Sequence, residues 1–402
     1  VGYEHKDTGP VDDFILGAKV DGTQWTNGKV SIDVKPDDAV ARFNMSFEGT
    51  TQTSTQGVTE QATIFTNGYH TFTASKAITF DGDRFTTSPA SIWVHPNNTT
   101  TGARTTISDL PILGGIADSY AVGEAKKRKG QSEAIAADKL QHRVLPEFDE
   151  GVDTEFATQN KDLEEKLIAR LREADLFPSA RSHSSSETEL WVSNRLMNES
   201  QLGGDSSTFT ATSDHGFALH LHQTWLNNAF SKLPLAGRTM TEAELIDEIG
   251  KAVGTLFGRD VDLSADKKEG EESDNTKFVF PSADVFRVRI ENNQLILILR
   301  TGLQPEDGDA IPTQEISIPL QFSIKGTDIV IEAGNVSVSP VEPVSQLVQI
   351  PRAGIVQTKI QKALPTRMVD RVIDLKRSNG GPVTLAVTRI KPNSGWLSIV
   401  IE

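Results

Sequence analysis

Apolar and polar side chains alternate along much of the first quarter of the chain, the pattern of strands that bury one face and expose the other. Residues 30–34 and 41–47 are clear examples, in which Val, Ile, Phe and Met alternate with Ser, Asp, Arg and Asn. Asn-Gly and Asp-Gly pairs suit tight turns because they tolerate left-handed backbone conformations. Such pairs predict turns at Asn27-Gly28, Asn67-Gly68 and Asp81-Gly82. We therefore expect a sandwich or a curved antiparallel sheet between Phe14 and Ile107.

The pattern becomes helical from about Ile116 to Phe177, where Ala, Glu, Lys and Leu dominate. One helix is predicted from Ser132 to Leu145, and Pro146 is expected to end it because proline disrupts a helix interior. A second helix is predicted from Val152 to Leu176, where apolar residues recur at spacings of three, four and seven. Together these segments predict an antiparallel helical hairpin that packs on a sheet.

The last part of the chain mixes both patterns. Thr241 and Glu244 form a capping box at the start of a predicted helix. Hairpins are predicted with turns at Asn292-Asn293 and Gly326-Thr327, and between Val383–Ile390 and Trp396–Ile401. A further helix, kinked at Pro365, is predicted for Ile355–Leu375.

This order of elements predicts an α+β fold with antiparallel curved sheets or a β-sandwich, a central helical hairpin and further helices packed on the sheets. A chain of 402 residues is long enough for more than one hydrophobic core. We predict a β-rich domain at 1–112, a helical connector at 113–180 and an α+β domain at 181–402.

The net charge of -15 argues against nucleic acids and anionic membranes as partners, because both attract clustered Lys and Arg. The chain has no cysteine, which excludes disulfides, thiolate zinc sites and cysteine nucleophiles. No run approaches the roughly 20 apolar residues of a transmembrane helix. The first residues, Val1-Gly2-Tyr3-Glu4, do not resemble a signal peptide, so we expect a signal to be absent from this chain.

The sharpest candidate site is the segment from Asp214 to His222. On a strand, His220 and His222 project from one face, as in several metal sites, and Asp214, His215 or a distant carboxylate would supply a third ligand. The alternative is that one histidine is a surface residue and the other forms hydrogen bonds where a strand meets a helix. The spacing does not decide between these interpretations, and no second ligand cluster is evident.

Other candidates carry less chemistry. The acidic segment Ser264–Asn275 has carboxylates for calcium but lacks the ligand spacing of a dedicated loop, so a solvated loop is the alternative. Asn227 and Asn228 are expected to bond to nearby backbone at a junction. The chain has no Gly-x-Ser-x-Gly elbow and no phosphate-binding loop, so we nominate no catalytic residue and expect no cofactor.

Three stretches carry a resemblance to a known family: 141–149 (QHRVLPEFD), 222–229 (HQTWLNNA) with 235–239 (LAGRT), and 395–399 (GWLSI). They resemble a family of large secreted or envelope-associated proteins of planctomycete-type bacteria. This resemblance implies a periplasmic, secreted or cell-surface location and supplies no catalytic residues. The expected architecture, long helices cupped by curved antiparallel sheet, is also similar to the tubular lipid-binding fold, which implies an apolar groove.

Three functions follow as hypotheses. The first is a non-catalytic envelope or extracellular protein that binds or assembles, with envelope components or further copies of itself as partners. The second is a carrier of a lipid or other hydrophobic ligand, which requires a continuous apolar cavity between helix and sheet. The third is a metal-dependent hydrolase that uses His220 and His222. Because no catalytic constellation is present, we favour a non-catalytic protein over an enzyme.

Overall fold

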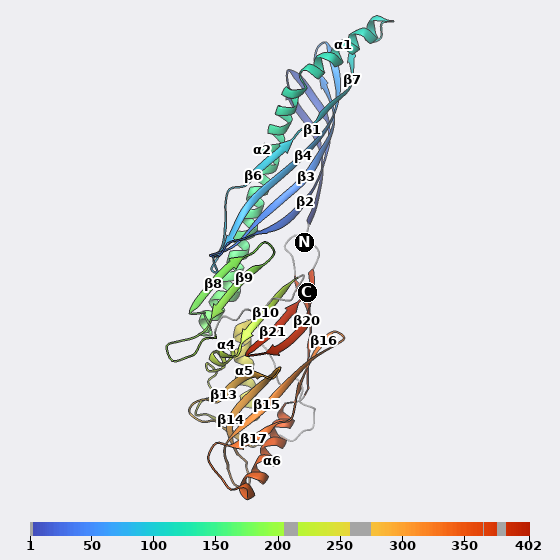
Figure 1. The fold of residues 1–402 in the computed structure, drawn as a ribbon. Coiled ribbons are helices and arrows are strands. Elements are labelled where there is room, and N and C mark those ends of the chain that lie inside the picture. Colours follow the sequence, from blue (N-terminus) through green and yellow to red (C-terminus); the bar gives the residue numbers. More distant parts are fainter. Residues whose placement is uncertain (1–2, 205–215, 258–274, 365, 376–382) are drawn as a thin grey trace. The chain divides into compact units, whose positions relative to one another are not determined.

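A computed structural model describes residues 3–204, 216–257, 275–364, 366–375 and 383–402. The chain forms two compact units: Val1–Glu165 with Arg181–Ser193 (unit 1), and Lys166–Ala180 with Asn194–Glu402 (unit 2). The predicted α+β class, with curved antiparallel sheets, is confirmed (Figure 1). The three predicted domains stay a prediction. None of the described helices has the length and apolar character needed to cross a membrane.

Unit 1 is built on one antiparallel sheet whose first four strands follow each other in chain order, and whose later strands all pair with β4. The long strands are β1 (Tyr3–Ile15), β2 (Ala18–Lys35), β3 (Ala41–Val58) and β4 (Ala62–Phe80). The short strands are β5 (Phe85–Thr87), β6 (Ser91–His95) and β7 (Asn98–Thr105). The alternating segments 30–34 and 41–47 lie in β2 and β3, as predicted.

Two of the three predicted turns are wrong, because Asn27-Gly28 and Asn67-Gly68 lie in the middle of β2 and β4. Gly28 is needed there for a different reason. A Cβ atom at Gly28 would lie 2.3 Å from a ring carbon of Phe47, so the glycine makes room for an aromatic ring on the next strand. Asp81-Gly82 does form a turn after β4, and Gly82 has a φ of +96°.

The predicted helical hairpin is also wrong in detail. Helix α1 (Leu113–Lys127) is followed by one long helix, α2 (Lys129–Leu163), with Pro146 in its interior. A π-helical turn (Glu164–Ile168) and the short helix α3 (Ala169–Glu173) come next. An interior proline costs about 3 kcal/mol. The helix continues because five side chains on one face are buried, each worth about 2 kcal/mol: Leu140, Val144, Phe148, Val152 and Phe156.

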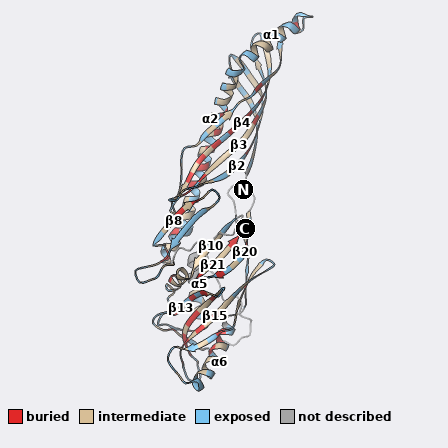
Figure 2. Ribbon diagram, in the orientation of Figure 1, coloured by how far each residue is buried: buried red, intermediate tan, exposed pale blue. Residues whose placement is uncertain are grey.

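The buried hydrophobic residues of the helix–sheet core in unit 1 lie along α2, β3 and β4 (Figure 2). Phe43, Ala74 and Ile78 of the sheet pack with Phe148, Val152 and Phe156 of α2, and Phe72 packs with Leu140 and Val144. Within this core, the Lys76 side chain is 1% exposed, and its ammonium group forms ion pairs with Asp149 and Asp153 of α2. The closed hydrophobic core therefore ends near Leu140. The rest of the interface between helix and sheet, on the N-terminal side of Leu140, is not part of this core.

The paired strands β8 (Ala180–Ser185) and β9 (Leu190–Arg195) span the boundary of the two units in sequence. Unit 2 itself contains two further antiparallel sheets. One sheet comprises β10 (Phe217–His222), β21 (Trp396–Ile401), β20 (Val383–Asn393) and β19 (Val372–Leu375). The other comprises β11 (Thr239–Met240), β12 (Lys277–Val279), β13 (Phe286–Glu291), β14 (Gln294–Gln304), β15 (Ile311–Lys325), β16 (Asp328–Ala333), β17 (Ser337–Pro340) and β18 (Arg367–Asp370). The helices are α4 (Gln223–Phe230), α5 (Glu242–Phe257) and α6 (Gln346–Ala363).

The local predictions for unit 2 hold with one exception. The hairpins β13–β14, β15–β16 and β20–β21 are confirmed. The capping box is confirmed, because the Thr241 amide donates to the Glu244 carboxylate (2.7 Å) and the Glu244 amide donates to the Thr241 hydroxyl (3.3 Å). The helix predicted for Ile355–Leu375 is wrong beyond Ala363, since β18 and β19 pair with β16 and β20 instead. Pro365, the predicted kink, lies outside the described residues.

Candidate ligand-binding site

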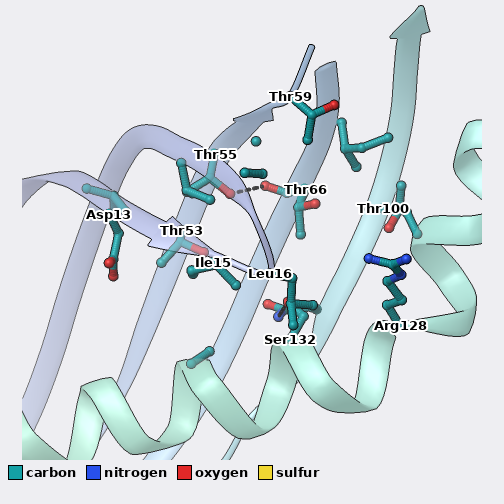
Figure 3. Close-up of a pocket in the computed structure, with 18 of the residues that line it drawn as sticks. Asp13, Ile15, Leu16, Thr53, Thr55, Thr59, Thr66, Thr100, Arg128 and Ser132 are labelled. Atoms are coloured by element: carbon teal, nitrogen blue, oxygen red, sulfur yellow. Dashed lines mark hydrogen bonds between the residues drawn. The ribbon is translucent and has the colours of Figure 1, made fainter. Parts of the chain in front are cut away.

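A cavity of about 830 Å³ lies in unit 1 between the sheet and the helices α1 and α2. Strands β1, β2, β3, β4 and β7 supply one wall, and the helices supply the other (Figure 3). It begins where the closed core ends, because Leu140 belongs to both. The apolar groove that the architectural resemblance implies therefore has a counterpart in this structure.

The sheet wall is hollow because its side chains become small. The inward positions of β3 are every second residue, and they read Phe43, Met45 and Phe47 in the closed core. Further along the same face the residues are Gly49, Thr51, Thr53, Thr55 and Gly57, and the last four line the cavity. Alternate residues of a strand share a face, so this change from Phe to Thr and Gly converts core into cavity along one strand.

The helix wall shows the same change. Small residues at helical spacing line the cavity: Ala117, Ala121, Ala125, Ser132 and Ala136. Residues four apart lie on one face of a helix, so these positions lie above the small residues of the sheet. At the next two positions of this face, Leu140 and Val144 are buried and the gap closes. The cavity thus results from missing bulk on both walls.

One end of the cavity combines apolar side chains with the uncharged polar residues Thr59, Gln61, Thr105 and Thr106. Ile15 and Leu16, at the turn between β1 and β2, line it together with Ile64, Ile107 and Tyr120. Ile107 is 43% exposed and Tyr120 is 70% exposed, so this end is open to solvent. An apolar molecule can therefore reach the cavity here without unfolding of the sheet.

The other end is polar. A row of side chains crosses the sheet there (the polar rung: Thr26, Thr51 and His70), of which Thr51 and His70 line the cavity. Thr26 pairs in register with Thr51, and Thr51 with His70. All three are buried, and the Thr26 and Thr51 hydroxyls are 3.0 Å apart. Burial lowers the pKa of His70, although Glu133 opposes this shift, so the imidazole is neutral near pH 7.

Two cations of α2 connect the helix to the sheet, Lys139 at the level of Ile64 and Arg143 beside the rung. The Lys139 ammonium forms an ion pair with Asp13 of β1 (2.6 Å), and this hydrogen bond lowers the pKa of Asp13. The half-buried Arg143 guanidinium donates hydrogen bonds to the side chains of Gln24 and Thr26, the latter at 3.2 Å. These bonds hold β1 and β2 against the helix.

The structure places His220 and His222 on β10, as expected, and away from this cavity's lining. His220 Nδ1 lies 2.8 Å from the Ser398 hydroxyl, and His222 Nδ1 lies 2.8 Å from the Thr224 hydroxyl. His222 is also the residue that precedes α4 and accepts a hydrogen bond from the Thr224 amide. Burial lowers the pKa of both histidines.

Within the described parts of the chain, no group of three or more His, Asp or Glu side chains is arranged to hold a metal ion. Asp214 and His215, the proposed further ligands, lie outside the described residues, so the metal site stays a prediction. Most of the acidic segment Ser264–Asn275 also lies outside them. The junction role of the two asparagines is confirmed: Asn227 bonds to the backbone of Val288, and Asn228 bonds to the carbonyls of Leu196 and Leu202.

Sequence reasoning did not identify the cavity residues, because none of them belongs to a chemical motif. A signal was present nonetheless. Only Gly, Thr, Ala and Ser stand at strand positions 49, 51, 53, 55 and 57 and at helix positions 117, 121, 125, 132 and 136, whereas the same faces carry large residues further along. Small residues on a helix and on strands can be recognised as the two walls of a cavity only when it is known that these elements face each other.

No protein-family model matches the chain, and no curated protein matches it. The resemblance to planctomycete-type envelope proteins therefore stays a prediction. Among solved structures, a crystal structure of lipopolysaccharide binding protein matches 99% of this chain and 91% of its own, at 9% identity and a TM-score of 0.37. A score this low does not establish a shared fold.

Proposed function

We propose that this protein binds a lipid or another small hydrophobic molecule in the cavity of unit 1. The observation that carries the proposal is the cavity of about 830 Å³ between sheet and helix, whose lining combines Ala, Ile, Leu and Val with Thr and a smaller set of charged side chains. Ligand sites are concave, largely apolar and fitted with a few polar groups, and most have volumes of roughly 300–1,000 Å³. The sequence-based hypothesis of a carrier required a continuous cavity of this kind.

Cavity-filling substitution tests the proposal. Ala136 lines the cavity, so the side chain of Ala136→Phe would occupy part of it. Ala134 lies two residues away on the same helix, is exposed and does not line the cavity, so Ala134→Phe is a matched control. Both variants add the same apolar surface and replace the same helix former.

The measurement is binding of a neutral fluorescent probe of apolar surface, N-phenyl-naphthylamine, by the full chain. Native mass spectrometry and organic extraction of the purified protein would identify any lipid that copurifies. We expect saturable probe binding in the wild type and the Ala134→Phe variant, and at least about tenfold weaker binding in Ala136→Phe, because a phenyl group excludes the probe. Equal binding by all three proteins would refute the proposal.

A non-catalytic role outside the cytoplasm is part of the same proposal, and the resemblance to envelope proteins is its support. Fractionation of cells that make the protein with its natural flanking sequence tests the location. Recovery from the cytoplasm alone would contradict it.

A further inference from the structure

The two ends of the cavity differ in polarity, and this difference bears on which molecule fits. The open end carries Ile15, Leu16, Ile107 and Tyr120 beside uncharged polar residues such as Thr59 and Gln61, whereas the inner end carries Thr51 and His70 of the polar rung and Arg143. Buried polar groups are costly unless they are hydrogen-bonded. Polar groups at the inner end are therefore not expected in a cavity that binds a purely apolar molecule. An amphiphile with its head group directed inward matches both ends.

Arg143 places a positive charge at the inner end, and the carboxylate that acts on His70, Glu133, is paired with another cation, Lys129 (3.5 Å). Among the described residues, the hydrogen-bond partners of Arg143 are neutral, Gln24 and Thr26, and it forms no ion pair. The carboxylates that line the cavity each have a cation elsewhere: Asp12 lies 4.0 Å from Lys19, Asp13 2.6 Å from Lys139, and Glu124 2.6 Å from Lys127. A half-buried guanidinium is stabilised by an anion. The guanidinium of Arg143 has five N–H donors, so it can bind an anion in addition to Gln24 and Thr26.

The rung adds neutral donors next to this cation. The Asn97 amide donates to His70 Nδ1 (3.4 Å), so the proton of the neutral ring belongs on Nε2, where it can be donated. The Thr51 hydroxyl bonds to Thr26 and retains capacity for a second bond. Arginine with imidazole and hydroxyl donors is a set that recognises anionic oxygens, as in a carboxylate or a phosphate.

We propose that the ligand is an amphiphile with an anionic oxygen head group, which binds Arg143 at the polar rung while its apolar chain extends toward Ile64 and Tyr120. This inference rests on the proposed function. It assigns Arg143 as the residue that determines specificity for the head group. Arg128 also lines the cavity and forms no ion pair among the described residues, but it is exposed, so water already stabilises its charge. Arg128 is therefore the rival position and the proper control.

The test compares ligands with the same chain and different heads: hexadecanoic acid, hexadecyl phosphate and the neutral hexadecanol. Their dissociation constants are measured by displacement of N-phenyl-naphthylamine from the full chain. We expect at least one anionic ligand to bind about 10- to 100-fold tighter than the alcohol, the range for hydrogen bonds to a charged group. The acid and the phosphate together distinguish the two sources of anionic oxygen.

Arg143→Gln should bring the affinity for the anionic ligand close to that for hexadecanol, so the ratio of the two dissociation constants falls toward one, whereas Arg128→Gln should leave the preference intact. Retained probe binding shows that the cavity of each variant is folded. In the wild type, added salt should weaken binding of the anion more than binding of the alcohol, a measurement that needs no variant.

The inference is overturned if the wild type binds acid, phosphate and alcohol equally, if the preference survives in Arg143→Gln, or if it is lost in Arg128→Gln instead. These outcomes leave the proposed function standing, because the alcohol still binds. Failure of the probe and all three ligands to bind would refute the proposed function itself.

Discussion

The ion pairs of Lys76 permit a prediction about which partner matters more for stability. The Lys76 side chain is 1% exposed, whereas the side chains of Asp149 and Asp153 are 37% and 48% exposed. Replacing both carboxylates by Asn leaves a buried ammonium without a counter-charge, which costs about 3 kcal/mol. Lys76→Met removes the buried charge and leaves two carboxylates that water can solvate, which costs about 1 kcal/mol or less. We therefore expect the conservative double Asp variant to be about 2 kcal/mol less stable than Lys76→Met.

The assay must report on unit 1 alone, because a chain with two compact units need not unfold in one transition. Hydrogen exchange followed by mass spectrometry of peptides from β4 and α2 gives the local free energy of opening. Peptides from β14 and β15 of unit 2 serve as the internal control. If Lys76→Met destabilises α2 as much as the double Asp variant does, the burial of the lysine does not determine how much each partner contributes to stability.

The ion pairs of Lys76 with Asp149 and Asp153 also predict that the stability of unit 1 depends on pH. Hydrogen bonds from Lys76 lower the pKa of Asp149 and of Asp153. A carboxyl group with a lowered pKa in the folded state stabilises that state above its unfolded pKa of about 3.9, and the contribution is lost as the pH falls below this value. The stability of α2 should therefore fall between about pH 5 and about pH 3 in the wild type, and less so in Lys76→Met. An equal fall in both proteins would contradict the assignment.

Three further substitutions test the packing of unit 1. Gly49→Ala should destabilise the sheet by about 1–3 kcal/mol, because its Cβ would lie 2.5 Å from the Phe72 ring. Gly57→Ala on the same strand is the control. Its Cβ would have its nearest neighbour at 3.5 Å, so this variant should be neutral or slightly stabilising. Urea denaturation followed by exchange in β3 peptides compares them, and equal effects would contradict the close approach. Pro146→Ala should stabilise α2 by about 2 kcal/mol, the cost of about 3 kcal/mol for an interior proline less about 1 kcal/mol of unfolded-state entropy. Unchanged exchange in α2 would show that the helix already compensates for the missing hydrogen bond.

The features that could be predicted from sequence are those decided by a few neighbouring residues. The turn at Asn292-Asn293 requires two residues with positive φ, and the structure gives +52° and +59°. The capping box requires only Thr241 and Glu244. In each case the chemistry that forms the feature is contained within four residues, so tertiary packing has little to change.

Features that depend on distant packing were predicted less well. Asn27-Gly28 has the composition of a turn, but Phe47 of the next strand makes the glycine necessary within a strand. Pro146 has the local character of a helix end, but the buried face of α2 outweighs it. The candidate site shows the same contrast. His220 and His222 form a conspicuous local pattern, whereas the cavity consists of small residues from five strands and two helices.

The size of the cavity itself limits how it can be filled. A dry and empty space of 830 Å³ would cost about 20 kcal/mol at roughly 24 cal/mol per Å³. Because a folded chain is stable by only about 5–15 kcal/mol, the cavity must contain either water or a ligand. The hydroxyl groups of Thr53, Thr55 and Thr66 make it a wall that water can wet, while the Ala residues of the helices remain apolar. Binding of an amphiphile would then replace water along the apolar wall, and calorimetry should show a negative change in heat capacity that is smaller in Ala136→Phe, where the side chain already occupies part of that volume.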